Sequence, residues 1–179
     1  MTVPTKLILL RILLIPVFLG LLFSDLDAAR IYAFAIFAVA AATDLFDGII
    51  ARKYNQVTDF YKIMDPLADK LLICSALVAL VSTHDIAAWF AILIICRDFI
   101  VTGLRLFAAS KDVVLGAVIS GKANTFFQMI LVMFILIGFD CPYANTVKQV
   151  LIYIVILLTV ISLAENFIRN RKLIGRIKL

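Results

Sequence analysis

The sequence has few charged residues and few cysteines for its length. Only 16% of its 179 residues are charged, whereas 64% are hydrophobic. So few charges cannot form the polar surface of a water-soluble globule, which excludes that class of protein. The three cysteines are too scattered for a metal knuckle, so we expect them to be small apolar core residues.

The chain also lacks features that would divide it into domains and a signal peptide that would be cleaved from it. No Gly/Ser linker, internal repeat or low-complexity block interrupts it, so we expect a single domain over residues 1–179. No cleavable signal peptide is evident, because the first apolar segment starts soon after Met1 and no small-residue cleavage site precedes Ser24. We therefore expect the N-terminus to be retained.

Long apolar runs make up most of what is there. Each run has about 20 residues, which is the length that a helix needs to cross a bilayer. The sequence therefore predicts an all-α, polytopic integral membrane protein with about six transmembrane helices. We place these helices at residues 7–23, 31–51, 62–82, 86–108, 118–138 and 146–165.

Lysine and arginine are concentrated on one side of the predicted helices. Most of the 17 basic residues lie there, whereas Arg30 and Lys148 lie on the opposite side. The positive-inside rule then places both termini in the cytoplasm. The net charge of +5 follows from this bias and from attraction to anionic headgroups, so we expect membrane lipid, and no nucleic acid, as a partner.

Four aspartates stand out, because acidic side chains within or beside a hydrocarbon layer are costly and so indicate a function. Asp44 and Asp47 lie on one face of their helix, and so do Asp65 and Asp69, because the members of each pair are about one turn apart. Carboxylates without His or Cys partners suit Mg²⁺ or Mn²⁺ rather than zinc. The two pairs therefore predict a metal centre for phosphate chemistry at the cytoplasmic face.

Small and basic residues follow the first pair. Gly48 and Ala51 lie beside Asp47 on the same helical surface, so a bulky group can approach the backbone closely. Arg52 comes next and is suited to pair with a phosphate oxygen.

The spacing Asp44-x2-Asp47-Gly48-x2-Ala51-Arg52-x12-Asp65-x3-Asp69 resembles the signature of the CDP-alcohol phosphatidyltransferases. Tyr61 departs from it, because the family has a glycine at this position. Further segments resemble the phosphatidylglycerophosphate synthase branch of that family. They are residues 3–7 with Arg11, where an Asn usual near Thr5 is missing, residues 97–105 with Asp98 for Glu, and residues 121–125 with Asn124 for Lys.

This resemblance implies a site for two divalent cations, Mg²⁺ or Mn²⁺. Its ligands would be Asp44, Asp47, Asp65 and Asp69. Asp69 would complete the metal site or act as general base on the acceptor hydroxyl. The CDP pocket would be lined by Gly48, Ala51 and Arg52, and Tyr61 would either obstruct it, stack on the cytosine or point away.

The site for the acceptor substrate is predicted from the remaining basic side chains. Arg97 and Arg105 are close to two helical turns apart and share one face of a helix, and Lys122 opens the next span on the same side. Together they suit a small dianion such as glycerol 3-phosphate, although Arg105 and Lys122 also suit interface snorkelling. We do not expect Arg97 to pair with Asp98, because adjacent helical residues point apart.

The resemblance implies an enzyme, a homodimer in a bacterial cell membrane, that converts CDP-diacylglycerol and glycerol 3-phosphate into phosphatidylglycerophosphate and CMP. Three alternatives stay open. The first is a sister enzyme for inositol phosphate, serine or a phospholipid, since Asn124 leaves one lysine in its segment. The second is a divalent-cation carrier, against which the missing internal repeat argues. The third is a nonenzymatic relative, because of Tyr61.

Overall fold

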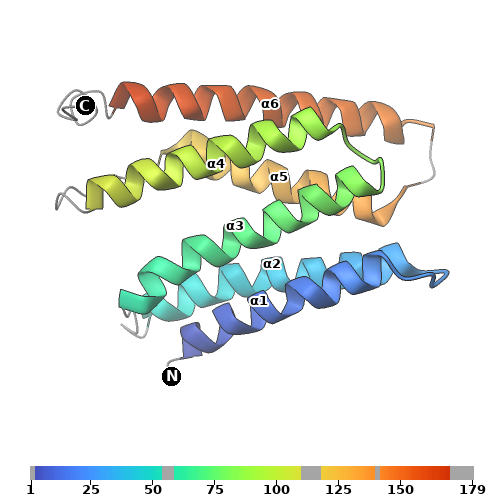
Figure 1. Ribbon diagram of the computed structural model, residues 1–179, viewed down its shortest axis with the longest axis horizontal. Helices are drawn as coiled ribbons and strands as arrows, with labels where there is room; N and C mark the ends of the chain where they lie inside the picture. The colour runs from blue at the N-terminus through green and yellow to red at the C-terminus, as the bar shows by residue number, and fades with distance from the viewer. Residues whose placement is uncertain (1–2, 54–58, 110–117, 140–141, 170–179) are drawn as a thin grey trace. The chain divides into compact units, whose positions relative to one another are not determined.

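The computed structural model describes residues 3–53, 59–109, 118–139 and 142–169, and it leaves out the side chains of residues 3–4, 45–53, 59–63, 106–107 and 109. The described residues form six helices and no strand, which confirms the all-α class (Figure 1). The helices are α1 (Val3–Leu22), α2 (Ala29–Lys53), α3 (Asp59–Ser82), α4 (Ala88–Ala109), α5 (Ile119–Ile137) and α6 (Ala144–Arg169). Each of the six predicted ranges overlaps one of them.

Three of these helices have the length and composition of membrane spans. Within the described ranges, α1, α5 and α6 are long and apolar enough to cross a bilayer. The chain is therefore an all-α membrane protein. Helix α4 also has the length of a span but contains Arg97, Asp98 and Arg105. A total of six spans stays a prediction.

The chain divides into two compact units, and one boundary between them falls within α5. Unit 1 comprises Met1–Ile86 and Val132–Cys141, and unit 2 comprises Ala87–Leu131 and Pro142–Leu179. The prediction of one domain over residues 1–179 stays a prediction, and each unit is described by itself.

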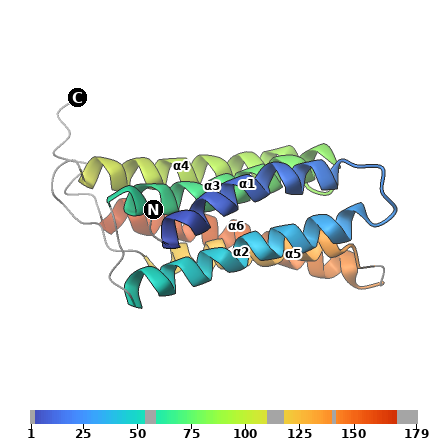
Figure 2. The same cartoon turned by 90° about the horizontal axis from the view of Figure 1, so that it is seen from below.

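In unit 1, helix α1 packs along both α2 and α3. Phe18 of α1 meets Phe37 of α2, with ring centroids 5.7 Å apart. Ile8 of α1 and Ala68 of α3 are fully buried in one apolar cluster. The first turns of α1 and α3 and the last turn of α2 lie at the same end of this unit (Figures 1 and 2). That end therefore contains both predicted aspartate pairs.

The opposite end of unit 1 is closed by a polar clamp. Arg30 at the start of α2 donates to Asp85 over 2.8 Å and 3.3 Å, and Thr83 donates to the same carboxylate over 2.6 Å. His84, which lies between Thr83 and Asp85, has a φ of 59°, which is uncommon for a residue with a Cβ. The clamp ties the turn after α3 to α2, and it contains none of the predicted site residues.

In unit 2, α4 packs against α6. The buried residues of α6 form one stripe at helical spacing, and they are Val155, Thr159, Ser162 and Asn166. Small and polar residues of this kind allow close approach and hydrogen bonding between helices in a membrane. The polar stripe of α6 therefore faces partners within unit 2 rather than lipid.

Candidate active site

The acidic end of unit 1 is organised around a buried arginine. Arg11 of α1 has 0% of its side chain exposed, and its Nη1 lies 2.6 Å from Oδ1 of Asp44 and 3.7 Å from Oδ1 of Asp65. Asp44 belongs to α2 and Asp65 to α3. The structure thus brings one member of each predicted pair together on a guanidinium from a third helix.

Apolar packing sets this register. Ile8 lies one turn before Arg11, and it packs in one cluster with Ala68, which follows Asp65 on α3. Asp69 follows Ala68 directly and is partly buried. The apolar contact between α1 and α3 therefore places Arg11 beside Asp65.

The sequence predicts Arg11 on the basic side of the membrane and as part of the N-terminal resemblance, and it does not predict Arg11 in the acidic cluster. A signal for that role was present, because Arg11 lies inside an apolar helix. A charged residue at such a position needs an ionic partner.

The aspartate oxygens fit a hard divalent cation. The side chains of Asp44 and Asp65 are 27% and 32% exposed, so a solute can reach both carboxylates. The two Oδ1 atoms lie 2.6 Å and 3.7 Å from the same nitrogen, so the structure brings both carboxylates to one place in unit 1. Carboxylate oxygens are the ligands that Mg²⁺ and Mn²⁺ prefer.

Several predicted site residues lie outside the described side chains. They are Asp47, Gly48, Ala51, Arg52 and Tyr61, whose backbones lie in α2 and α3. Their predicted roles stay predictions. The described side chains, from which Asp47 is missing, contain no group of three His, Cys, Asp or Glu residues that could hold a metal.

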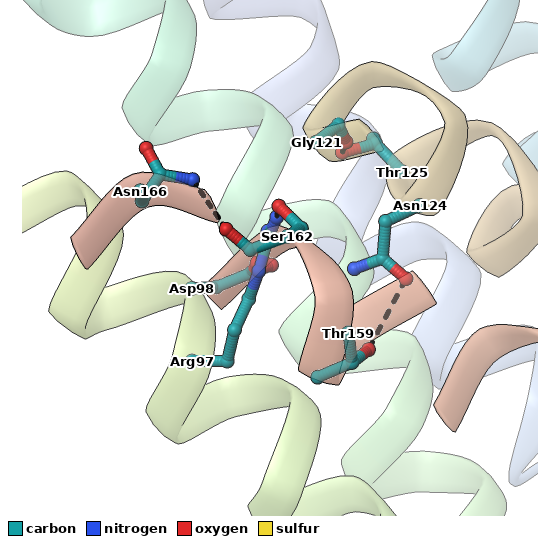
Figure 3. Close-up of polar contacts among 8 residues, drawn as sticks. All are labelled: Arg97, Asp98, Gly121, Asn124, Thr125, Thr159, Ser162 and Asn166. Carbon is teal, nitrogen blue, oxygen red and sulfur yellow. Dashed lines mark hydrogen bonds and ion pairs between the residues drawn. The ribbon is translucent and has the colours of Figure 1, made fainter. Parts of the chain in front are cut away.

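The predicted separation of Arg97 and Asp98 is wrong. Arg97 Nη1 donates to Asp98 Oδ1 over 2.6 Å, and the two side chains are 4% and 3% exposed. Arg97 also donates through Nη2 to Ser162 of α6 (Figure 3). Adjacent Cα–Cβ bonds do point apart, but the long arginine side chain bends back because a buried charge needs a partner.

The start of α5 is held against this pair. A Cβ added to Gly121 would lie 3.4 Å from both Arg97 Nη2 and Ser162 Oγ, so the glycine allows α5 to approach closely. Ser120 donates to Glu165 of α6 over 2.7 Å. Lys122, the next residue along α5, is exposed.

Asn124 has a partner of its own on α6. Its side chain is fully buried, and its Oδ1 accepts a hydrogen bond from Thr159 over 3.1 Å (Figure 3). Asn124 thus joins α5 and α6. The phosphatidylglycerophosphate synthase branch, which this segment resembles, has a lysine at that position. Three basic side chains are predicted to bind the acceptor substrate. Arg105 and Lys122 are exposed, whereas the Arg97 guanidinium contacts Asp98 and Ser162.

Comparisons with known proteins identify the family. Residues 1–161 match CDP-alcohol phosphatidyltransferase. The chain is 37% identical over 182 residues to CDP-diacylglycerol–glycerol-3-phosphate 3-phosphatidyltransferase of Bacillus subtilis, covering 93% of this chain and 94% of that protein. It is 40% identical over 173 residues to a probable phosphatidylglycerophosphate synthase of Mycobacterium tuberculosis, covering 95% and 82%. A protein of Escherichia coli with the same name as that of B. subtilis is 37% identical over 139 residues, covering 75% and 76%. The chain therefore belongs to the CDP-alcohol phosphatidyltransferase family.

Proposed function

We propose that this protein transfers the phosphatidyl group of CDP-diacylglycerol to glycerol 3-phosphate, which gives phosphatidylglycerophosphate and CMP. The main support is identity of 36–40% over most of the chain to proteins whose names state this reaction or its product. The convergence of Asp44 and Asp65 on one guanidinium supports it independently, because it joins the two halves of the acidic signature.

The acidic cluster is the proposed centre for two divalent cations. Its ligands are Asp44, Asp47 and Asp65, and Asp69 completes the metal site or acts as general base. Carboxylate oxygens of this kind suit Mg²⁺ or Mn²⁺. Bound there, the cations would neutralise the diphosphate and polarise the phosphorus. Gly48 and Ala51 leave room for the nucleotide, and Arg52 pairs with a phosphate oxygen. Tyr61 would obstruct this pocket, stack on the cytosine or point away from it.

The bond changes need one proton acceptor. The hydroxyl oxygen of the acceptor attacks the phosphorus attached to diacylglycerol, and the bond from that phosphorus to CMP breaks. Asp69 takes the proton of the hydroxyl, and CMP leaves with the electron pair of the broken bond. Asp69 lies one turn after Asp65 on α3, at the acidic end of the unit.

The phosphate of glycerol 3-phosphate is assigned to the cations of unit 2. Arg105 and Lys122 are exposed and suited to bind a dianion. Arg97 lies close to Gly121, the residue before Lys122, so it is near this phosphate site. We also propose that this chemistry and both termini lie at the cytoplasmic face, which the bias of lysine and arginine favours. The family resemblance favours a homodimer among the lipids of a bacterial cell membrane.

The test is CMP release by the purified protein in mixed micelles of CDP-diacylglycerol. Glycerol 3-phosphate, inositol phosphate, serine and phosphatidylglycerol are supplied separately, each with and without divalent cation. We expect release with glycerol 3-phosphate and Mg²⁺ or Mn²⁺, and none in excess chelator. Faster release with another acceptor would favour a sister enzyme, and full activity in chelator would contradict the metal mechanism.

If none of the four acceptors causes release of CMP, an enzymatic role in this reaction is contradicted. In that case, the same protein reconstituted in vesicles is assayed for Mn²⁺ uptake. Uptake would favour the divalent-cation carrier, whereas its absence would leave the nonenzymatic relative.

A further inference from the structure

Arg11 is the one described residue of α1 whose charge faces carboxylates of two other helices. It is fully buried, although arginine is almost never fully buried unless it is paired. Its ion pairs reach Asp44 on α2 and Asp65 on α3, which belong to different helices. One guanidinium is thus a common partner of both halves of the acidic cluster.

The geometry leaves both carboxylates able to bind a cation. The ion pairs involve Oδ1 of each aspartate, and a carboxylate has two oxygens with about four acceptor sites. About a third of each side chain is open to solvent, whereas the guanidinium is closed to it. A solute therefore meets the aspartates and not the arginine.

We propose that Arg11 is the positioning residue of the acidic cluster, holding Asp44 and Asp65 at the spacing at which they bind divalent cations. This inference rests on the proposed function. Both ion pairs go through the same nitrogen, Nη1, whose place is fixed by the rigid plane of the guanidinium, whereas a lysine ammonium is a point charge on a flexible stem. Arg11→Lys should therefore retain the charge and lose part of the positioning.

The test measures Mn²⁺ binding to the purified full-length protein in detergent, without CDP-diacylglycerol, from the electron paramagnetic resonance signal of free Mn²⁺. Arg11→Gln should weaken binding by about 10–100-fold, as expected when a partner of metal ligands is removed. Arg11→Lys should weaken it less. Thermal unfolding of each variant in chelator is recorded in parallel.

Arg30→Gln is the matched control. It removes an arginine that pairs with an aspartate in the same unit, but at the end that has none of the predicted metal ligands. Its Mn²⁺ affinity should equal that of the parent, even if its melting temperature falls. In activity assays, excess Mn²⁺ should restore turnover of Arg11→Gln, because a positioning defect raises the concentration of metal that is required.

Equal Mn²⁺ affinity in the parent and Arg11→Gln would overturn the proposal and leave Arg11 as a structural ion pair. Tighter binding in the variant would also overturn it, because Arg11 would then be a competing counter-ion. If Arg11→Gln does not fold, unchanged affinity in Arg11→Lys overturns it. Absence of Mn²⁺ binding by the parent would contradict the metal centre itself, which distinguishes the two failures.

Discussion

At the residue scale, the buried charged side chains of this apolar chain each contact a charged or polar partner. Arg11 lies between two carboxylates, and Arg97 contacts Asp98 and Ser162. Removing one member of such a group leaves a buried charge without compensation, which costs more than the pair contributes. Substitutions at exposed members therefore report on chemistry more directly than those at buried members.

Asp69→Asn tests the proton acceptor. The amide keeps the size of the carboxylate but cannot accept the hydroxyl proton, so we expect kcat to fall by about 10²–10⁴-fold with a smaller effect on substrate binding. Initial rates of CMP release over a range of both substrates measure this. Undiminished turnover in the variant would remove Asp69 from the base role.

Lys122→Gln tests the acceptor site. Losing one charged donor to the phosphate should raise the KM for glycerol 3-phosphate about tenfold or more, and that for CDP-diacylglycerol much less. Arg105→Gln should behave in the same way. Lys6→Gln, which removes another exposed lysine, is the control and should change neither value. Equal increases for both substrates would indicate that Lys122 supports the fold or contacts lipid headgroups.

At the scale of elements, α6 contacts α4 and α5 through polar side chains on successive turns. Its stripe of Thr159, Ser162 and Asn166 is buried, while most of its other residues face outward. Lipid is as apolar as a core, so hydrophobicity provides little force between helices in a membrane. Hydrogen bonds and close packing at small residues therefore determine how α6 is seated within unit 2.

Thr159→Val tests this seating. The substitution keeps the shape of the side chain and removes the donor to Asn124, which is fully buried. We expect a loss of about 0.5–2 kcal/mol in the free energy of unfolding, the range for hydrogen bonds between membrane helices. Denaturation in detergent, compared with Thr146→Val at an exposed position of the same helix, measures the difference. Equal stability of the two variants would contradict a structural role for this bond.

At the scale of the whole molecule, the distribution of basic residues predicts the orientation in the membrane. Most lysines and arginines are expected on the side of the termini, and this bias determines topology in membrane proteins. Epitope tags at either terminus should be digested by protease in inverted vesicles and protected in right-side-out vesicles. A tag inserted after Asp25, in the turn between α1 and α2, should show the opposite pattern if α1 spans the membrane. Digestion of a terminal tag in right-side-out vesicles would contradict the prediction.

The sequence by itself determined the helices and the acidic signature. Each predicted span overlaps a helix of the structure, because backbone hydrogen bonds in an apolar environment are satisfied within the segment itself. The spacing of Asp65 and Asp69 likewise placed both on one helix face through local geometry. The family followed from these residues because the signature is a local pattern.

Only the tertiary structure decided which charges and polar groups meet. Arg11 with Asp44, Arg97 with Ser162, and Asn124 with Thr159 are partners from different helices. Helices that are apolar on all sides do not reveal from sequence which face turns toward protein, because lipid and core are equally apolar. Packing settles that choice, and it made Arg11 part of the acidic cluster and joined Arg97 to Asp98 and Ser162.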